Sequence, residues 1–251
     1  MDLHQQVLDS LQDRQVLEVR IGLRWTAVVV DKGDQVQCGL ASTLETDHTH
    51  SRSPTVPGAG QLEEKRGIEL AEWIGSKVAI RRSIGCAAIN ALLDYQPSRW
   101  VKANAVEAIR TRGKDKKVVL IGHFPFVKDL EDELEDFSVL ELNPTGDDLP
   151  ASSAPDLLPR ADVVAITGMT FINGTLGHLL ELCQPHAFII LLGPTTPLSQ
   201  VLHDRGVDLL AGSVVRDVPA VLRVLSQGGN FRQIHQAGVQ LILQAEDRSL
   251  T

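Results

Sequence analysis

Short, almost wholly apolar runs alternate with stretches of helical spacing in the C-terminal half of the chain. Five of these runs are strand candidates, at residues 117–121, 138–142, 162–167, 187–192 and 208–211. Apolar runs without polar alternation are typical of strands that are buried on both faces of a parallel sheet. Helical patterns separate them, roughly at residues 128–136, 175–183, 198–205 and 218–227. This alternation predicts right-handed crossovers and a Rossmann-like α/β domain.

The N-terminal part has a different order of elements. Residues 2–13 place apolar side chains at helical spacing, which predicts an amphipathic helix. Two β-rich runs, 16–31 and 35–41, flank a short polar connection that contains Gly33, and this pattern predicts a hairpin. Two helical stretches follow, at 61–76 and 82–94. We therefore predict a smaller α+β domain over residues 1–112, followed by the Rossmann-like domain over residues 113–251.

A long polar stretch without periodicity, residues 42–60, separates the hairpin from these helices. Loops of this length are usually functional or mobile. This one contains His48 and His50 near Glu45 and Asp47, and imidazole and carboxylate groups suit borderline divalent metals. A His-x-His pair in such a loop is more often solvated than metal-bound, so we expect the main site elsewhere.

Turn-forming residues follow all five strand candidates directly. The five segments are Gly122-His123-Phe124-Pro125, Asn143-Pro144-Thr145-Gly146, Gly168-Met169-Thr170 with Asn173-Gly174-Thr175, Gly193-Pro194-Thr195-Thr196-Pro197, and Gly212-Ser213. Open α/β sheets bind ligands outside the carboxyl ends of their strands, where loops and helix N-termini meet. The same residue types are ordinary in turns, and Asn173 and Thr175 could equally cap a helix. Five such loops on one edge favour a site there, with His123 as its histidine.

The first of these loops lacks the fingerprint of a dinucleotide site. Its sequence is GHFPFV and not G-x-G-x-x-G, and Phe124 and Pro125 take the place that a diphosphate would need. Glu141 follows Gly122 by 19 residues, at the position where an acidic side chain binds ribose hydroxyls in such sites. The sequence thus disfavours NAD and FAD but leaves open a nucleoside-type ligand such as S-adenosylmethionine. Glu141 could equally be a surface acid at the end of a strand.

Composition narrows the classes of protein further. Apolar residues make up 43% of the chain, enough for a well-buried core, and the formal net charge of −8 argues against a nucleic-acid-binding protein. The three cysteines form no Cys-x-x-Cys pair, so we expect neither a disulfide framework nor a thiolate zinc site. No signal peptide and no bilayer-spanning apolar run is visible, which predicts a cytoplasmic protein without membrane insertion. The sequence leaves open whether the protein forms a homo-oligomer.

Several of these segments together resemble one known family. They are Gly122-His123-Phe124-Pro125, Glu141, the segment ITGMTFINGTLGHLLEL (166–182) and Gly193-Pro194-Thr195-Thr196-Pro197-Leu198. The family that they resemble is named putative heavy-metal chelation, and its C-terminal domain is Rossmann-like. The segment SIGCAAINALL (83–93) and the hairpin around Trp25 resemble its companion N-terminal domain, which is similar to the N-terminal domain of enolase. The resemblance covers nearly the whole chain.

The resemblance implies a site at the interface of the two domains, which binds a divalent heavy metal or a metal chelator. The ligand-binding positions that it implies are Asn90, Gly122, His123, Phe124, Pro125, Glu141, Thr167, Asn173, Thr175, Gly193, Pro194, Thr195 and Thr196. If a metal binds, we expect His123 and Glu141 as its protein ligands, with a small-molecule chelator supplying the others.

Three functions remain open on the sequence alone. The leading hypothesis is a protein that binds a small anionic or metal-chelating ligand between its domains. The second is an enzyme that uses a nucleoside-type cofactor, with Glu141 on the ribose. The third is a binding or regulatory subunit without catalysis, which the lack of a recognisable acid–base pair supports.

Overall fold

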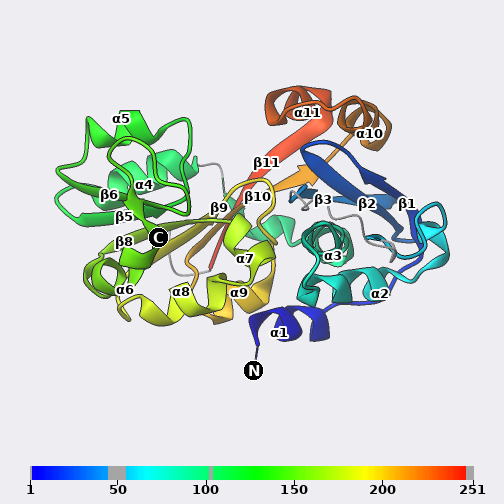
Figure 1. The fold of residues 1–251 in the computed structure, drawn as a ribbon, viewed down its shortest axis with the longest axis horizontal. Helices are drawn as coiled ribbons and strands as arrows, with labels where there is room; N and C mark the ends of the chain where they lie inside the picture. The colour runs from blue at the N-terminus through cyan, green and yellow to red at the C-terminus, as the bar shows by residue number, and fades with distance from the viewer. Residues whose placement is uncertain (1, 45–54, 102–103, 247–251) are drawn as a thin grey trace.

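The computed structural model describes residues 2–44, 55–101 and 104–246. They form one sheet of eight strands and one of three strands, with helices packed around both (Figure 1). The large sheet is mainly parallel and the small one is antiparallel, so the mixed α/β architecture agrees with the predicted fold class. None of the helices in these ranges combines the length and the apolar character needed to cross a membrane.

The large sheet contains a reversal of strand order. From one edge to the other, its strands are β4 (Trp100–Val101), β11 (Val239–Ala245), β10 (Leu209–Val215), β9 (Phe188–Leu192), β8 (Val163–Thr167), β5 (Lys117–Ile121), β6 (Asp136–Glu141) and β7 (Leu149–Pro150). The chain moves one way from β5 to β6, and then continues on the other side of β5 with β8, β9 and β10. The loops after β5 and β8 therefore leave the sheet in opposite directions. Open α/β sheets form their ligand crevices at such a topological switch point.

Both faces of the large sheet are buried, which explains the continuous apolar runs. Val118 and Leu120 of β5 belong to the core on one face, whereas Val119 and Ile121 belong to the core on the other. On the first face lie α4 (Ala105–Gly113) and α5 (Val127–Glu131), and on the second lie α6 (Ala154–Leu157), α7 (Met169–Asn173), α8 (Leu176–Leu182) and α9 (Gln200–Asp204). The 3-10 turns η4 (Ala151–Ser153) and η5 (Leu158–Arg160) flank α6.

The small sheet is covered by helices from both ends of the chain. Its strands are β1 (Val16–Ile21), β2 (Trp25–Asp31) and β3 (Val36–Ser42), in that order. On one face α3 (Ala79–Leu92) packs against Val28 and Val30. On the other face α10 (Val218–Ser226) and α11 (Phe231–Gly238) pack against Trp25 and Ala27 (Figure 1). Helices that follow the large sheet in sequence thus complete the core of the N-terminal sheet.

The remaining short elements lie around α3 and the start of the large sheet. They are α1 (Leu3–Asp9), η1 (Leu62–Glu64), α2 (Gly67–Ala71), η2 (Glu72–Gly75) and η3 (Pro97–Arg99). The contact between α3 and β3 is especially close, because a Cβ atom on Gly39 would overlap the backbone of Ala87 and Ala91. Gly39 of β3 therefore allows the backbone of α3 to lie directly against the sheet.

Most predicted elements are present, but three expectations were wrong. The run at 16–31 is two antiparallel strands, β1 and β2, and only the turn at Gly33 is the predicted hairpin. The helical stretch at 61–76 is broken into η1, α2 and η2. Gly212 and Ser213 lie within β10 and not in a loop after it, because β11 pairs with β10 along its whole length.

Candidate functional site

A cavity of about 640 Å³ lies at the switch point, and we call it the switch-point cavity. Its wall contains the last residues of β5, β6 and β8 and the loops that follow them. Leu44, Ala79 and Arg82 contribute a second wall from the N-terminal part of the chain. Seven of the expected ligand-binding positions line this cavity: Gly122, His123, Phe124, Glu141, Thr167, Asn173 and Thr175.

Gly122 follows β5 directly and lines this cavity next to the end of β8. Its φ is +100°, in the left-handed region that side chains other than glycine rarely adopt. A Cβ atom there would lie 2.9 Å from Cβ of Thr167 and 3.4 Å from the Phe124 ring. Glycine at this position therefore allows the two strand ends to approach each other, and it keeps the cavity open.

The buried carboxylate of Asp148 holds His123, and no sequence motif pointed to Asp148. The His123 Nδ1 atom lies 3.0 and 3.1 Å from the two carboxylate oxygens of Asp148. The His123 side chain is 49% exposed and that of Asp148 only 3%. Because a carboxylate can only accept, Nδ1 donates to it, and in the neutral ring Nε2 therefore keeps its lone pair. His123 is thus prepared to bind a metal or accept a proton through Nε2.

The charge of Asp148 is stabilised by the loop that contains it. The backbone N–H of Thr145 donates to its carboxylate at 3.1 Å, and the Thr145 hydroxyl donates at 3.2 Å. Burial alone would raise the pKa of Asp148, but these hydrogen bonds and the one from His123 outweigh it and leave the pKa below its usual value. Asp148 is therefore ionised at neutral pH and fixes the tautomer of His123.

Arg82 also lines the cavity, although no sequence motif points to it. It lies near the start of α3, and one guanidinium Nη1 donates to the Ser76 carbonyl at 3.1 Å. No carboxylate in the described ranges pairs with it, and its buried Nε has no hydrogen-bond partner there. The Arg81-Arg82 pair follows no recognised motif. Arg82 adds a positive charge opposite the acidic and imidazole groups of the strand ends.

Asn173 and Thr175 partly satisfy each other's hydrogen bonds. The Asn173 Oδ1 atom accepts from the Thr175 backbone N–H at 3.0 Å and from its hydroxyl at 2.7 Å. Thr175 occupies the N-cap position of α8 but makes no side-chain cap bond. Both residues also line the cavity, so their role in the turn between α7 and α8 is compatible with contact to a ligand.

The remaining expected positions do not line the switch-point cavity. They are Asn90, Pro125, Gly193, Pro194, Thr195 and Thr196. Asn90 is buried, and its Nδ2 donates to the Leu40 carbonyl at 2.8 Å and to the Thr195 carbonyl at 3.1 Å. The Thr195 hydroxyl in turn accepts from the Ser42 backbone N–H at 3.1 Å. These contacts join the small sheet and α3 to the loop after β9.

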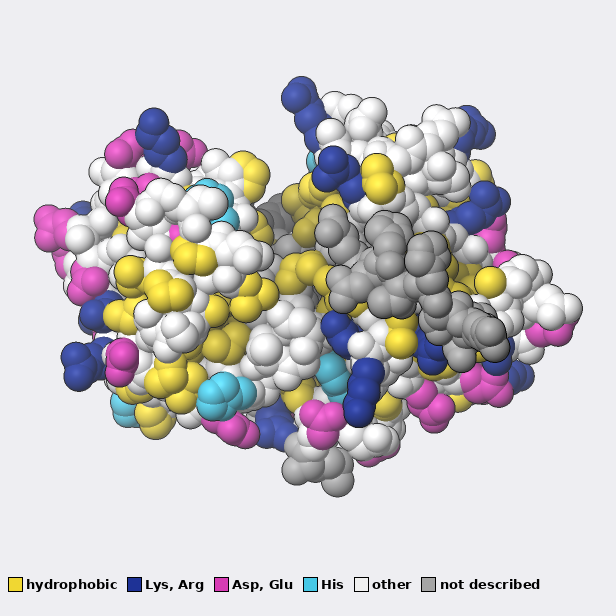
Figure 2. All heavy atoms as spheres, in the orientation of Figure 1, with side chains coloured by type: hydrophobic (Ala, Val, Ile, Leu, Met, Phe, Trp, Pro, Cys, Tyr) yellow, Lys and Arg dark blue, Asp and Glu magenta, His cyan; other side chains and the backbone are white. Residues whose placement is uncertain are grey.

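Much of the cavity wall is apolar. Figure 2 shows hydrophobic side chains gathered on the part of the surface where Figure 1 places β8, α6 and α8. Leu142, which is 70% exposed, lies at the cavity together with Leu179 and Phe124. The Phe124 ring stacks on that of Phe126, with 5.1 Å between their centres. A ligand of this cavity would therefore contact both charged groups and a carbon-rich wall.

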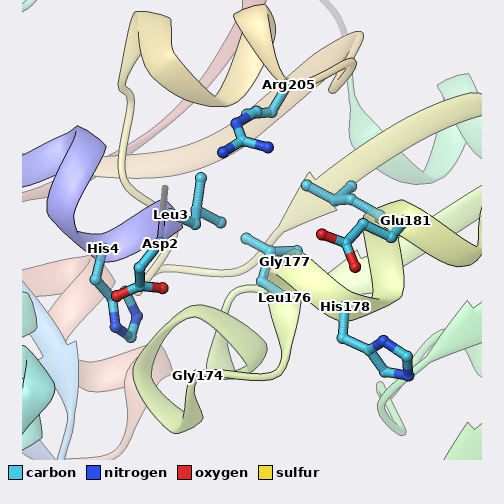
Figure 3. Close-up of a pocket in the computed structure, with 10 residues that line it drawn as sticks. Asp2, Leu3, His4, Gly174, Leu176, Gly177, His178, Glu181 and Arg205 are labelled. Atoms are coloured by element: carbon cyan, nitrogen blue, oxygen red, sulfur yellow. The ribbon is translucent and has the colours of Figure 1, made fainter.

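A smaller cavity of about 270 Å³ shares His178 with the switch-point cavity. Figure 3 shows Asp2 and His4 on one side of it, His178 and Glu181 of α8 on another, and Arg205 reaching in from a third. The ring of His4 is already engaged, because its Nε2 lies 2.6 Å from the Phe171 carbonyl oxygen. His4 therefore holds α1 against α7.

A metal cage made by protein side chains alone does not occur in residues 2–44, 55–101 and 104–246. No three His, Cys, Asp or Glu side chains in these ranges are placed to hold one ion together. Burial raises the pKa of the Cys38 thiol to about 12 and that of Cys183 to about 11, and it also raises the pKa of Cys86. His48 and His50, with Glu45 and Asp47, lie outside the described residues.

Comparison with known proteins identifies relatives along nearly the whole chain. Two family models match, at residues 104–244 and 4–93, and both are described as "Putative heavy-metal chelation". An uncharacterized protein of Methanocaldococcus jannaschii is 29% identical over 222 residues, which cover 85% of this chain and 84% of that protein.

Two crystal structures of proteins with unknown function from the same family have this fold. The one from Desulfitobacterium hafniense has a TM-score of 0.83 and 26% identity, over 97% of this chain and 98% of that one. The one from Pyrococcus horikoshii has a TM-score of 0.81 and 22% identity, with the same coverage. The likeness to both structures supports the two-sheet architecture described above.

Proposed function

The chain belongs to the putative heavy-metal chelation family, and we propose that it binds a small anionic metal chelator, together with its metal, in the switch-point cavity. The observation that carries this proposal is the meeting of Arg82, His123 and Glu141 on one cavity. Arg82 offers a positive charge, and the other two offer metal ligands. The ligand would lie between residues 1–112 and 113–251, which we take as the two domains of a cytoplasmic protein.

The anionic part of the ligand is inferred from Arg82. A guanidinium group is planar and donates in a fixed fork, which matches a carboxylate or a phosphate. Arg82 is bonded to a backbone carbonyl and to no carboxylate within the described residues, so its charge is left for a ligand. The apolar wall around Phe124 and Leu179 would contact the carbon skeleton of the chelator.

The metal part of the ligand is inferred from His123 and Glu141. Asp148 orients the His123 ring and, in the neutral ring, holds the proton on Nδ1, as outer-shell carboxylates do for histidine ligands of metals. Glu141 ends β6 on the neighbouring strand and lines the same cavity. Imidazole and carboxylate together suit borderline divalent metals such as nickel and zinc. The chelator would supply the other metal ligands.

Isothermal titration with Ni²⁺–nitrilotriacetate tests this proposal, because that complex is anionic and keeps coordination positions open for protein side chains. We expect one saturable site. Its affinity should fall by at least about tenfold in His123→Ala and in Glu141→Ala, since even an outer-shell partner typically contributes that much. Binding of nitrilotriacetate without metal should weaken in Arg82→Gln.

His235→Ala is the matched control, because His235 is an exposed histidine on α11 and does not line the cavity. Its affinity should equal that of the unmodified protein. If binding survived in both His123→Ala and Glu141→Ala, these residues would not be the metal ligands. If it weakened equally in His235→Ala, the signal would come from surface histidines.

The position of Glu141 also favours a second candidate, an enzyme or binding protein for a nucleoside-type ligand. Glu141 ends the strand next to β5, where an acidic side chain binds ribose hydroxyls in Rossmann-like domains. A true ligand raises the melting temperature by mass action. Stabilisation by S-adenosylmethionine, and not by metals or their chelates, would favour this candidate over the first.

A further inference from the structure

Another cavity, of about 500 Å³, lies apart from the switch-point cavity and shares no residue with it. Its wall includes Arg14 before β1, Lys32 after β2, Tyr95 after α3, Trp100 in β4 and Arg216 after β10. Neither the metal chemistry nor the ligand proposed above uses any of these residues. We call this space the Trp100 cavity.

The Trp100 cavity carries an excess of positive charge. Its lining contains Arg14, Lys32 and Arg216 as cations and Asp94 as an acid. Lys32 and Asp94 neutralise each other, because the Lys32 ammonium lies 2.7 Å from a carboxylate oxygen of Asp94. The same ammonium also donates to the carbonyls of Leu92 and Leu93, so each of its three N–H groups has an acceptor. Two arginine charges therefore remain on this wall.

Neither arginine meets a carboxylate within the described part of the chain. The Arg14 Nη2 atom donates to the amide oxygen of Gln12 at 2.9 Å, and the Arg216 Nε atom donates to that of Gln240 at 2.8 Å. Both partners are neutral, so they orient the guanidinium groups without cancelling their charge. Arginine forks held in this way are suited to a carboxylate or a phosphate.

The wall also contains buried donors that lack acceptors. Arg14 Nε and Trp100 Nε1 are both buried without a hydrogen-bond partner in residues 2–44, 55–101 and 104–246. Buried N–H groups are nearly always paired in folded proteins, so these two side chains of the wall have more donors than the described residues have acceptors for them. The guanidinium groups of Arg14 and Arg216 bring donors and positive charge to the same wall, and an anion supplies acceptor atoms and a negative charge together.

An aromatic surface completes the cavity. The Arg216 guanidinium lies over the Trp100 ring, 5.4 Å from its centre, and Tyr95 meets the same ring edge-on at 6.1 Å. The cation–π contact keeps the arginine at the cavity and polarises the ring beside it. An indole and a phenol ring offer contact to a carbon skeleton, which inorganic ions lack.

From these observations the geometry points to a second ligand site: the Trp100 cavity binds a small organic anion through Arg14 and Arg216, with its carbon skeleton against Trp100 and Tyr95. The ligand carries a carboxylate or a phosphate group. This inference does not rest on the proposed function, because the two cavities have no residue in common.

Intrinsic fluorescence provides a direct measurement, since Trp100 lines the cavity and the chain has only two other tryptophans, Trp25 and Trp73. Citrate and phenyl phosphate serve as the carboxylate and phosphate probes, titrated at constant ionic strength. We expect a saturable change in emission with at least one of them. Arg216→Gln and Arg14→Gln should each weaken binding by roughly 10- to 100-fold, the loss expected when a hydrogen bond to a charged group is removed.

Arg223→Gln is the matched control, because Arg223 lies on α10 and does not line this cavity. Its affinity should be unchanged, and so should that of His123→Ala, which alters the other cavity. Arg216→Lys keeps the charge but loses the fork, and it should retain part of the affinity. Circular dichroism checks that each variant is folded.

The inference is overturned if neither probe gives a saturable signal. It is also overturned if the affinity stays the same in both Arg14→Gln and Arg216→Gln, or falls equally in Arg223→Gln. In the last case the signal would report the general charge of the surface and not a built site.

Discussion

Asp148→Asn separates the charge of the Asp148 side chain from its shape. In the native protein one carboxylate oxygen accepts from both the backbone N–H and the hydroxyl of Thr145, while both oxygens lie within 3.1 Å of His123 Nδ1. An asparagine has only one acceptor oxygen. If that oxygen keeps the Thr145 bonds, the amide NH₂ faces His123 Nδ1. The ring must then move its proton to Nε2, where it blocks a metal.

The size of the effect follows from these contacts. The loss of an outer-shell partner typically lowers metal affinity 10- to 100-fold, which corresponds to about 1.4–2.8 kcal/mol. The variant also loses a hydrogen bond to a charged group, one that typically stabilises the fold by about 1.5–3 kcal/mol. Because His123 is half exposed and water can replace its partner, we expect the loss of stability to be about 1 kcal/mol, below that range.

Titration with Ni²⁺–nitrilotriacetate measures the affinity, and urea denaturation measures the free energy of unfolding. Asp147→Asn is the matched control, since Asp147 is the exposed neighbour in the same loop and removes the same charge. We expect Asp147→Asn to behave as the native protein. Native affinity in Asp148→Asn would refute the tautomer argument, and an equal loss in both variants would show that only the overall charge of the loop matters.

Two further predictions concern the fold and its pH dependence. Gly122→Ala should lower the free energy of unfolding, measured by urea denaturation, by about 2–4 kcal/mol. The alanine would have to adopt a left-handed backbone conformation, and its Cβ atom would lie 2.9 Å from Thr167 Cβ. A decrease below about 1 kcal/mol would mean that the ends of β5 and β8 are not in contact. His203 is buried, and burial lowers its pKa below the usual 6.5, so below that pH the unfolded chain binds a proton that the folded chain does not. The free energy of unfolding should therefore fall as the pH drops from about 7 toward the lowered pKa. Denaturation curves measured between pH 7 and 5 should show a smaller dependence of this free energy on pH in His203→Gln. An unchanged dependence would show that His203 is not its source.

Local apolar patterns predicted β5, β6, β8, β9 and β10 of the large sheet, whereas β4, β7 and β11 were not predicted. The apolar run at 117–121 coincides with β5, and β8 and β9 differ from their predictions by one residue at the N-terminal end. The prediction for β10 stopped early at residue 211, because Gly212 and Ser213 are typical of turns. Their place in β10 depends on the antiparallel partner β11, which lies about 30 residues further along the chain.

Some residues of the switch-point cavity could be predicted from the sequence, and others are brought there only by the tertiary structure. His123, Glu141 and Thr167 could be expected at one edge, because the carboxyl ends of parallel strands always meet there. Arg82 comes from the other side of the cavity, and no pattern around it indicates that it faces β5. The resemblance implied Asn90 as a binding residue; its Nδ2 donates to the Leu40 and Thr195 carbonyls, a contact that only the tertiary structure could show.

The sequence by itself determined the alternation of strands and helices, the apolar core and the polar loops at the strand ends, because periodicity and turn chemistry act between near neighbours in the chain. Only the tertiary structure decided the strand order, and with it the switch point between β5 and β8. It also brought Asp148 onto His123 across 25 residues, and it placed α10 on the small sheet. These contacts depend on how whole helices and strands pack against one another. Close packing requires complementary shapes of elements that lie far apart in the sequence, and no short segment determines it alone.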